Sequence, residues 1–150
     1  GFMPIVVEVV SEEDYQAWVA KKKGAAQAAA ADNTKSFDTA ELVARGEKVY
    51  QSSCAACHQA NGMGLPGAFP AISGSKVATG PIADHINLVM NGKPGTAMAA
   101  FGGQLSDADL AAVVTYQRNA WDNKMGDAAQ PAEIAAARGG AAEAAAPAAQ

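Results

Sequence analysis

Apolar residues recur at helical spacing in three separate stretches of the chain. In the first stretch, one face holds Leu42, Gly46, Val49 and Tyr50. Asp38 and Glu41 precede this face at the spacing of a capping box, in which each side chain accepts a backbone N–H at the start of a helix. The pattern predicts a helix that begins at Asp38 and leads almost directly to Cys54.

The second and third stretches follow residues 61–80, which are rich in glycine and proline and predict an irregular loop. The second begins with Pro81 at its first position and stops at Asn91-Gly92. Its apolar face holds Ile82, Ile86, Val89 and Met90. The third begins at Ser106, which is spaced to cap the N–H of Asp109. Its core face holds Leu110, Val113, Val114 and Gln117 and reaches Trp121.

The flanks of these stretches have a different composition. A β-branched run from Ile5 to Val10 suits a strand, and a short amphipathic helix can follow from Ser11 to about Ala20. Alanine and glycine then dominate two segments, which bury too little apolar surface to become ordered. We therefore expect a mobile remnant of another domain at 1–20, a linker at 21–37, an all-α domain of three or so helices with long loops at 38–124, and a disordered tail at 125–150.

Charge and hydropathy exclude several kinds of partner. The formal net charge is −4, but residues 36–124 hold seven acidic and six basic side chains and are nearly neutral. No basic stripe could neutralise nucleic-acid phosphates, and Lys21-Lys22-Lys23 falls in the predicted linker. No apolar run approaches the ~20 residues that span a bilayer, and no signal peptide opens the chain. We expect a soluble, monomeric fragment that does not bind nucleic acid.

The most specific motif lies at the end of the first predicted helix, in Cys54-Ala55-Ala56-Cys57-His58. Cysteines three apart on a helical turn share one face, so both thiols can add to the two vinyl groups along one edge of a porphyrin. The adjacent imidazole can then ligate the iron. The motif predicts a covalent haem c held by Cys54 and Cys57, with His58 as an iron ligand.

Other interpretations of the two cysteines are a redox pair, half of a zinc site, or a structural disulfide. A thioredoxin-like redox pair would lie in a βαβ context, which the pattern does not predict. A zinc site would need two more thiolates or imidazoles, and the chain offers only His85. The motif in its all-α context favours haem.

The sixth iron ligand separates electron transfer from chemistry on a bound molecule, because only an open position admits a substrate. Met98 lies in a loop of small residues, 95–102, that permits close approach to a ring, forty positions beyond His58. We predict that Met98 is this ligand.

The other candidate ligands fit less well. Met63 follows His58 by five residues, a path of at most ~18 Å, which barely rounds the ring. Met90 lies on a core face, Met125 follows the last helix, and Met3 precedes the linker. His85 is a rival, and we expect it to be an ordinary surface or hydrogen-bonding histidine.

Residues 38–124 resemble a class I cytochrome c. The attachment motif, the Met98 loop, and the helix pair marked by Gly46/Tyr50 and Val113/Tyr116 carry the resemblance. It implies that the N- and C-terminal helices of the domain cross beside the haem. It also implies that Pro70, in Phe69-Pro70-Ala71-Ile72, accepts a hydrogen bond from the His58 ring through its carbonyl.

A closer resemblance is to the cytochrome domain fused to bacterial cytochrome c oxidase subunit II. It rests on Gly92-Lys93-Pro94-Gly95-Thr96-Ala97-Met98 and on residues 101–107, although Ala99 replaces the proline usual in that family. Residues 1–7 resemble the last piece of the subunit II copper domain, which makes 1–20 its remnant. The cysteines and histidines of the copper site are missing upstream of Cys54, so copper binding by this fragment is not expected.

This resemblance implies an electron-transfer domain and not an enzyme. An upstream cytochrome or a quinol–cytochrome c oxidoreductase would donate single electrons, and the dinuclear copper centre of the same oxidase subunit would accept them. The location would be periplasmic, at the outer face of the cytoplasmic membrane, with a tether before Gly1. The alternatives are a free-standing periplasmic shuttle cytochrome c, and a haem enzyme or gas sensor with an open sixth position.

Overall fold

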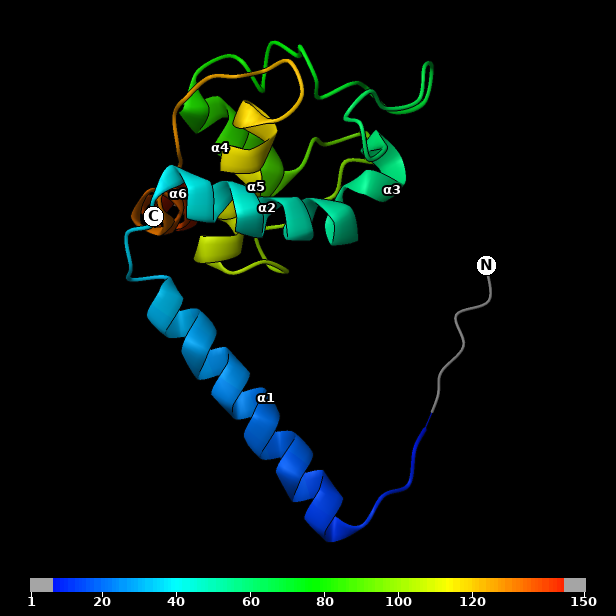
Figure 1. Ribbon diagram of the computed structural model, residues 1–150, viewed down its shortest axis with the longest axis vertical. Coiled ribbons are helices and arrows are strands. Elements are labelled where there is room, and N and C mark those ends of the chain that lie inside the picture. The colour runs from blue at the N-terminus through cyan, green and yellow to red at the C-terminus, as the bar shows by residue number, and fades with distance from the viewer. Residues whose placement is uncertain (1–6, 145–150) are drawn as a thin grey trace, which may run out of the picture.

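The computed structural model describes residues 7–144, which form six helices and no strand (Figure 1). The predicted all-α class is confirmed. The only β-bridge of this region is an isolated antiparallel one between Leu65 and Phe69. In chain order the helices are α1 (Glu12–Asp32), α2 (Thr39–Ser53), α3 (Ala55–His58), α4 (Ile82–Asn91), α5 (Asp107–Asn119) and α6 (Pro131–Ala144).

Side-chain caps start the helices close to where the sequence predicts. The Asp38 carboxylate accepts from the Glu41 backbone N–H, and the Glu41 carboxylate accepts from that of Asp38, so the capping box opens α2. The Ser106 hydroxyl accepts from the Asp109 N–H at the start of α5. In α4 the observed start is one residue later than predicted, because Pro81 is the N-cap and not the first helical residue.

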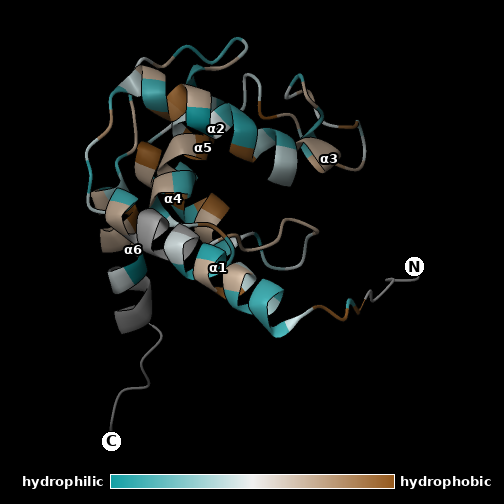
Figure 2. Ribbon diagram, turned by 60° about the horizontal axis from the view of Figure 1, so that its bottom comes forward, coloured by the Kyte–Doolittle hydropathy of each residue, from teal (hydrophilic) through white to brown (hydrophobic). Residues whose placement is uncertain are grey.

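The close crossing of α2 and α5 forms the centre of the core (Figure 2). A Cβ atom built on Gly46 would lie 2.0 Å from the Ala112 carbonyl oxygen and 2.7 Å from the Tyr116 Cβ. Only a glycine allows the two backbones to approach this closely. In α5 every residue from Leu110 to Arg118 is buried, since α2, α4 and α6 all pack on it. The predicted crossing of the two helices is therefore confirmed.

Arg118 is a buried cation that no sequence pattern indicated. Its side chain is 2% exposed and forms a two-pronged ion pair with Asp127, with N···O distances of 2.6 and 2.7 Å. The remaining guanidinium nitrogen donates to the carbonyls of Ala78 and Gly80. This arrangement satisfies the donors of a charge that would otherwise be costly to bury, and it joins the end of α5 to the loop before α4.

The N-terminal flank is more helical than predicted. Instead of ending near Ala20, α1 continues to Asp32 through most of the predicted linker at 21–37, because alanine has the highest intrinsic helix propensity. Arg45 bridges Asp32 and Asp109, at 2.8 Å to each, and so ties the end of α1 to α2 and α5. The predicted strand is also wrong for residues 7–10, which have no regular structure. The rest of that prediction, at residues 5 and 6, lies outside the described region.

The C-terminal flank is also folded where a disordered tail was predicted. Pro131 opens α6, the Glu133 side chain accepts from the Gln130 N–H, and Ile134 is fully buried. The alanine-rich composition misled the prediction, because one isoleucine and a few alanines suffice when α5 already offers an apolar face. The prediction for residues 145–150 lies outside the described region.

Substituting Gly46 should reveal how strongly the fold depends on the helix crossing. In Gly46→Ala, the added methyl group overlaps the Ala112 carbonyl, and we expect the free energy of unfolding to fall by about 1–3 kcal/mol. Gly24→Ala is the matched control, since Gly24 is also helical but has open space around it, and it should gain about 0.5–1 kcal/mol. Urea denaturation measures both. Equal effects would contradict the close approach of α2 and α5.

Candidate functional site

The attachment motif follows α2 directly, and the helix is broken once, at Cys54. Cys54 ends α2 and starts α3, and its carbonyl oxygen accepts from the N–H groups of Cys57 and His58 at 3.2 and 3.0 Å. Cys54 and Cys57 are therefore one helical turn apart, as the spacing predicts. Cys54 is buried and Cys57 exposed, and both are free thiols.

The surroundings of the cysteines fit the other interpretations poorly. Burial, with a smaller contribution from Cys57, raises the pKa of Cys54 to about 11, so this thiol is protonated at neutral pH, whereas a redox pair needs a reactive thiolate. Within residues 7–144, no group of three or more histidine, cysteine, aspartate or glutamate side chains is placed to hold a metal ion. A zinc site has no ligand set there.

His58 has one ring nitrogen committed to the protein. Its Nδ1 lies 2.9 Å from the Pro70 carbonyl oxygen, which is the hydrogen bond that the sequence resemblance implies. Because a carbonyl can only accept, the bond places the proton on Nδ1 and leaves the lone pair on Nε2. An imidazole held in this tautomer is oriented and made more basic as a ligand for iron.

The loop that carries Pro70 is shaped by glycines with positive φ. The Gly64 N–H donates to the His58 carbonyl at 2.9 Å. A Cβ atom on Gly64, where φ is +65°, would lie 2.3 Å from the Phe69 carbonyl oxygen and 2.5 Å from that of Pro70. The missing side chain therefore makes room for the Pro70 carbonyl beside the His58 ring.

Three aromatic side chains, from α2, α5 and the turn after α5, support this loop. Tyr50, Tyr116 and Trp121 pack with ring centroids 5.1 to 5.5 Å apart, and the Tyr50 hydroxyl donates to the Gln59 carbonyl at 2.6 Å. Gly62 lies against the Trp121 ring, where an added Cβ atom would come within 2.7 Å. The packing of α2 against α5 therefore fixes the positions of Gln59 and Gly62, which follow His58 in the chain.

Asn123 provides a second support, which sequence reasoning missed. Its amide oxygen accepts from the Gly74 N–H at 2.6 Å, and its amide nitrogen donates to the carbonyls of Ile72 and Gln117. The sequence shows only an asparagine shortly after the third predicted helix, and its burial became apparent from the structure. The side chain joins the far end of the Pro70 loop to α5.

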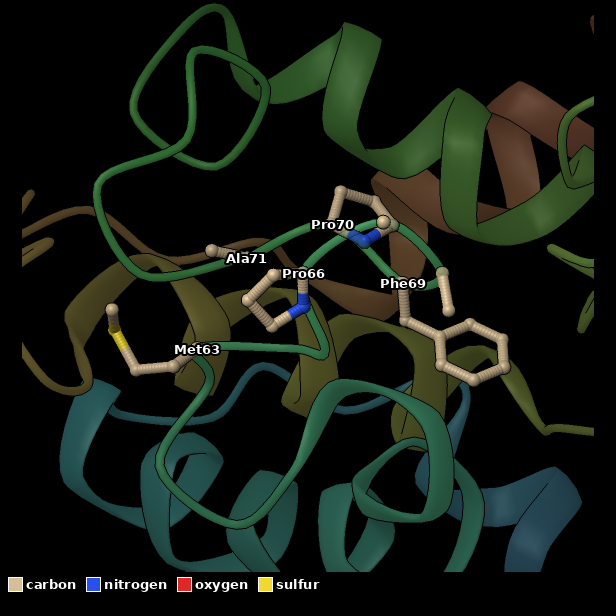
Figure 3. Close-up of a pocket in the computed structure, with 7 residues that line it drawn as sticks. Met63, Pro66, Phe69, Pro70 and Ala71 are labelled. Atoms are coloured by element: carbon tan, nitrogen blue, oxygen red, sulfur yellow. The ribbon is translucent and has the colours of Figure 1, made fainter.

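A cavity of about 470 Å³ opens beside the Pro70 loop, and Figure 3 shows Phe69, Pro66 and Pro70 around it. Its lining has no ionisable side chain and consists of Met63, Pro66, Gly67, Ala68, Phe69, Pro70 and Ala71. The cysteines, His58 and Met98 do not line this cavity, so it does not by itself mark the haem position. Two free thiols one turn apart and an imidazole with a free Nε2 are nevertheless the donor set of a covalently held haem. The residues present therefore fit the group that the motif predicts.

Met98 lies in an ordered loop and is half-buried. Its carbonyl oxygen accepts from the Lys93 N–H at 3.1 Å, and its own N–H donates to the Thr96 hydroxyl at 3.2 Å. Gly92, with φ +68°, permits this closure, since a Cβ atom there would lie 2.6 Å from the Met98 carbonyl oxygen. These contacts close the backbone of the loop, and the role of Met98 as an iron ligand stays a prediction.

Met90 lies where the sequence predicts it, whereas Met125 precedes a further helix, α6, and does not follow the last one. Met90 is 4% exposed and belongs to the core, as predicted. Met63 and Met125 are 57% and 39% exposed. Met3 lies outside the described residues.

His85 lies in the core and not at the surface. It is 3% exposed, and its Nε2 is 2.8 Å from the Gln117 side-chain oxygen. The prediction of a hydrogen-bonding histidine is confirmed, and the alternative of a surface position is wrong, because His85 is on the face of α4 that packs on α5. A ligand role would require it to leave Gln117 and the core.

Comparisons with known proteins agree with the haem interpretation. Residues 41–116, about half of the chain, match the family model described as "Cytochrome C oxidase, cbb3-type, subunit III". The dihydro-heme d1 dehydrogenase of Pseudomonas aeruginosa is 37% identical over 73 residues, which cover 49% of this chain and 14% of that protein.

Two other relatives are cytochromes or oxidase subunits. Cytochrome c-552 of Thermus thermophilus is 35% identical over 92 residues, 52% of this chain and 69% of that protein. The cbb3-type cytochrome c oxidase subunit CcoP of Azospirillum brasilense is 32% identical over 93 residues, 58% of this chain and 31% of that protein. The chain spans about two thirds of cytochrome c-552 and a third or less of the dehydrogenase and of CcoP.

Two glycine substitutions in one loop should separate the carbonyl contact from backbone strain. In Gly64→Ala, the methyl group displaces the Pro70 carbonyl from His58. We expect the free energy of unfolding to fall by about 1–3 kcal/mol, in addition to the cost of placing alanine in the left-handed backbone region. Gly67→Ala also has positive φ but open space, so only the backbone cost of about 1–2 kcal/mol applies. Proton NMR of the reduced protein should show the His58 Nδ1 proton in Gly67→Ala and its faster exchange in Gly64→Ala. The same signal in both would contradict the contact.

Burial of His85 should make stability depend on pH. Desolvation, with the nearby Arg118 charge, lowers the pKa of His85 to about 4, while the Gln117 hydrogen bond and Asp127 oppose the shift. Between pH 6.5 and 4 the unfolded chain binds a proton that the folded chain does not. The contribution of His85 to stability is therefore fully present above pH 6.5 and is lost as the pH drops through this window, by on the order of 3 kcal/mol. Urea denaturation of His85→Gln should show a flatter dependence, and parallel curves for the two proteins would contradict the assignment.

Proposed function

The chain belongs to the family described as cytochrome c oxidase, cbb3-type, subunit III, and from that premise we propose that residues 38–124 hold one haem c and transfer single electrons without transforming a substrate. The observation that carries the proposal is the His58–Pro70 hydrogen bond beside two free thiols one turn apart. It leaves an oriented Nε2 beside an attachment face, which is the arrangement that a resident haem requires.

The residues of the site divide the work between attachment and ligation. Cys54 and Cys57 would form the two thioether links, and His58 would bind iron through Nε2 while the Pro70 carbonyl holds its other ring nitrogen. When bound, the haem supplies an iron that gains and loses one electron. The Met98 thioether would be the second protein ligand of that iron, and a methionine ligand would favour the reduced state and so raise the reduction potential.

We further propose that the domain belongs to a cytochrome c oxidase subunit II and passes electrons to that subunit's dinuclear copper centre. The resemblance of residues 1–7, 92–98 and 101–107 to such a subunit supports this assignment. The end of α1 supports it as well, because Arg45 holds Asp32, and the Asn33 side chain accepts from the Ala108 N–H at the start of α5. A helix whose C-terminal end is fixed to the cytochrome domain, and whose remainder projects from it, would act as a spacer toward a preceding domain (Figure 1).

The spacer would have a defined reach. With a rise of 1.5 Å per residue, the 21 residues of α1 extend roughly 30 Å. A spacer of this kind keeps donor and acceptor at high effective concentration, which lessens the need for steering by surface charge. The nearly neutral composition of residues 36–124 is consistent with that arrangement.

The proposed setting is periplasmic, at the outer face of the cytoplasmic membrane, with a tether before Gly1. An upstream cytochrome or a quinol–cytochrome c oxidoreductase would supply the electrons. Among the helices within residues 7–144, none combines the length and the apolar character that crossing a bilayer requires.

A free-standing shuttle cytochrome is the second candidate function. It is favoured by the likeness to cytochrome c-552, of which the chain covers 69%. The two candidates differ in the partner and not in the site. Rapid electron transfer to a soluble copper domain of subunit II, compared with transfer to an unrelated copper protein, would favour the oxidase assignment.

Replacing Met98 tests the electron-transfer site directly. In Met98→Ala the thioether is lost, so we expect the methionine-to-iron charge-transfer band of the ferric protein to disappear and the ferrous protein to bind carbon monoxide. Met63→Ala is the control, since Met63 is 57% exposed, and it should keep the band and exclude carbon monoxide. Visible absorption spectra measure both effects. A band that survives in Met98→Ala would transfer the ligand role to Met90 or Met125, and carbon monoxide binding by the parent protein would favour an enzyme or gas sensor.

A further inference from the structure

The C-terminal helix reaches the loop that carries Met98 through a single side chain. α6 lies beyond the 41–116 segment that matches the family, yet its Arg138 extends to the chain between Met98 and α5. One guanidinium nitrogen donates to the Gly102 carbonyl, a second donates to the Leu105 carbonyl at 2.9 Å, and Nε pairs with Asp107 at 2.5 Å.

The three acceptors of Arg138 lie along one short segment. Gly102 and Leu105 bracket the turn after the Met98 loop, and Asp107 is the first residue of α5. A planar guanidinium holds several acceptors in a fixed relative geometry, which a lysine ammonium cannot do. Asp107 is 14% exposed at its side chain and Arg138 33%, so water screens this pair only partly.

The same segment is held from the other side by α4. The Phe101 N–H donates to the Val89 carbonyl and the Gly102 N–H to the Met90 carbonyl, at 3.1 and 2.9 Å. No room exists for a side chain at Gly102, where a Cβ atom would lie 2.9 Å from Met90. Gly102 is therefore held between α4 and Arg138, four residues after Met98.

On its N-terminal side the Met98 loop is closed by the Lys93 N–H and by Gly92. Between Met98 and Phe101 stand only two exposed alanines, Ala99 and Ala100, whose side chains restrain little. The position of the Met98 thioether therefore depends on how firmly the ends of the loop are held, and Arg138 contributes the only charged contact at Gly102 and Leu105 among the described residues.

We propose that Arg138 is a positioning residue that holds the Met98 loop in the conformation in which the thioether binds iron. The inference rests on the proposed ligand role of Met98. It gives α6 a function at the site, because the helix would stabilise the loop of the proposed iron ligand from outside the family's matched segment.

Competition by imidazole tests the inference in the ferric holoprotein. Free imidazole binds only when Met98 has left the iron, so its apparent affinity reports the fraction of protein with an open position. We expect Arg138→Gln to bind imidazole about tenfold more tightly than the parent protein, while the charge-transfer band is still present without imidazole. Arg138→Lys keeps the positive charge but loses the planar guanidinium, so its imidazole affinity should lie between those of the parent protein and Arg138→Gln.

Arg45→Gln is the matched control. Arg45 is 28% exposed and also bridges two acidic side chains, but it joins α1 to α2 and α5. The substitution Arg45→Gln should lower the midpoint of thermal unfolding without changing the imidazole affinity. Asp107→Asn removes the carboxylate partner of Arg138 and should also raise the imidazole affinity by freeing the Met98 loop. It replaces Arg138→Gln in the test if that variant does not fold.

The outcomes separate this inference from the proposed function. If the parent protein shows the charge-transfer band and Arg138→Gln binds imidazole no more tightly than the parent, the positioning role is overturned and the electron-transfer proposal stands. An equal gain in imidazole affinity in Arg45→Gln also overturns it, because the effect would then be one of general stability. If the parent protein lacks the band, both proposals fail.

Discussion

The close approach of α2 and α5 at Gly46 is the contact on which the geometry of the site depends. Because the two backbones meet there, Tyr50 of α2 and Tyr116 of α5 pack against each other and against Trp121. The tyrosine hydroxyl of α2 then holds the backbone just after the attachment motif, and the tryptophan ring covers Gly62 at the start of the Pro70 loop. The packing of the helical core therefore fixes the position of the Pro70 carbonyl relative to the His58 ring.

The long loop between α3 and α4 is irregular but not loosely held. Its backbone polar groups are satisfied by side chains and by other loop residues instead of by a helix or sheet. Asn123 bonds both Ile72 and Gly74, and Arg118 bonds the carbonyls of Ala78 and Gly80. Both of these side chains come from α5 or the turn after it. A single buried helix therefore organises a loop that has almost no regular structure of its own.

The sequence was sufficient to predict those features that depend on residues close together in the chain. Capping residues predicted the starts of α2 and α5, helical spacing brought Cys54 and Cys57 to one turn, and the resemblance to a family supplied the Pro70 carbonyl. The failures came from composition: alanine-rich flanks were predicted to be disordered, although alanine favours a helix and α5 offers a face for α6. Long-range polar contacts, such as those of Arg118, join residues far apart in the chain and leave no periodic signal.

Both predicted axial ligands are placed by structure outside their own short segments. His58 is oriented by a carbonyl in the next loop, and that loop is supported by the aromatic residues and by Asn123. Met98 lies on a loop whose ends are held by α4 and α6. An iron with two protein ligands has little freedom to rearrange when its charge changes, provided that both ligands stay in place in both states. Rigidity of two irregular loops, supplied by side chains of the surrounding helices, is therefore the physical requirement that links the stability of this fold to electron transfer.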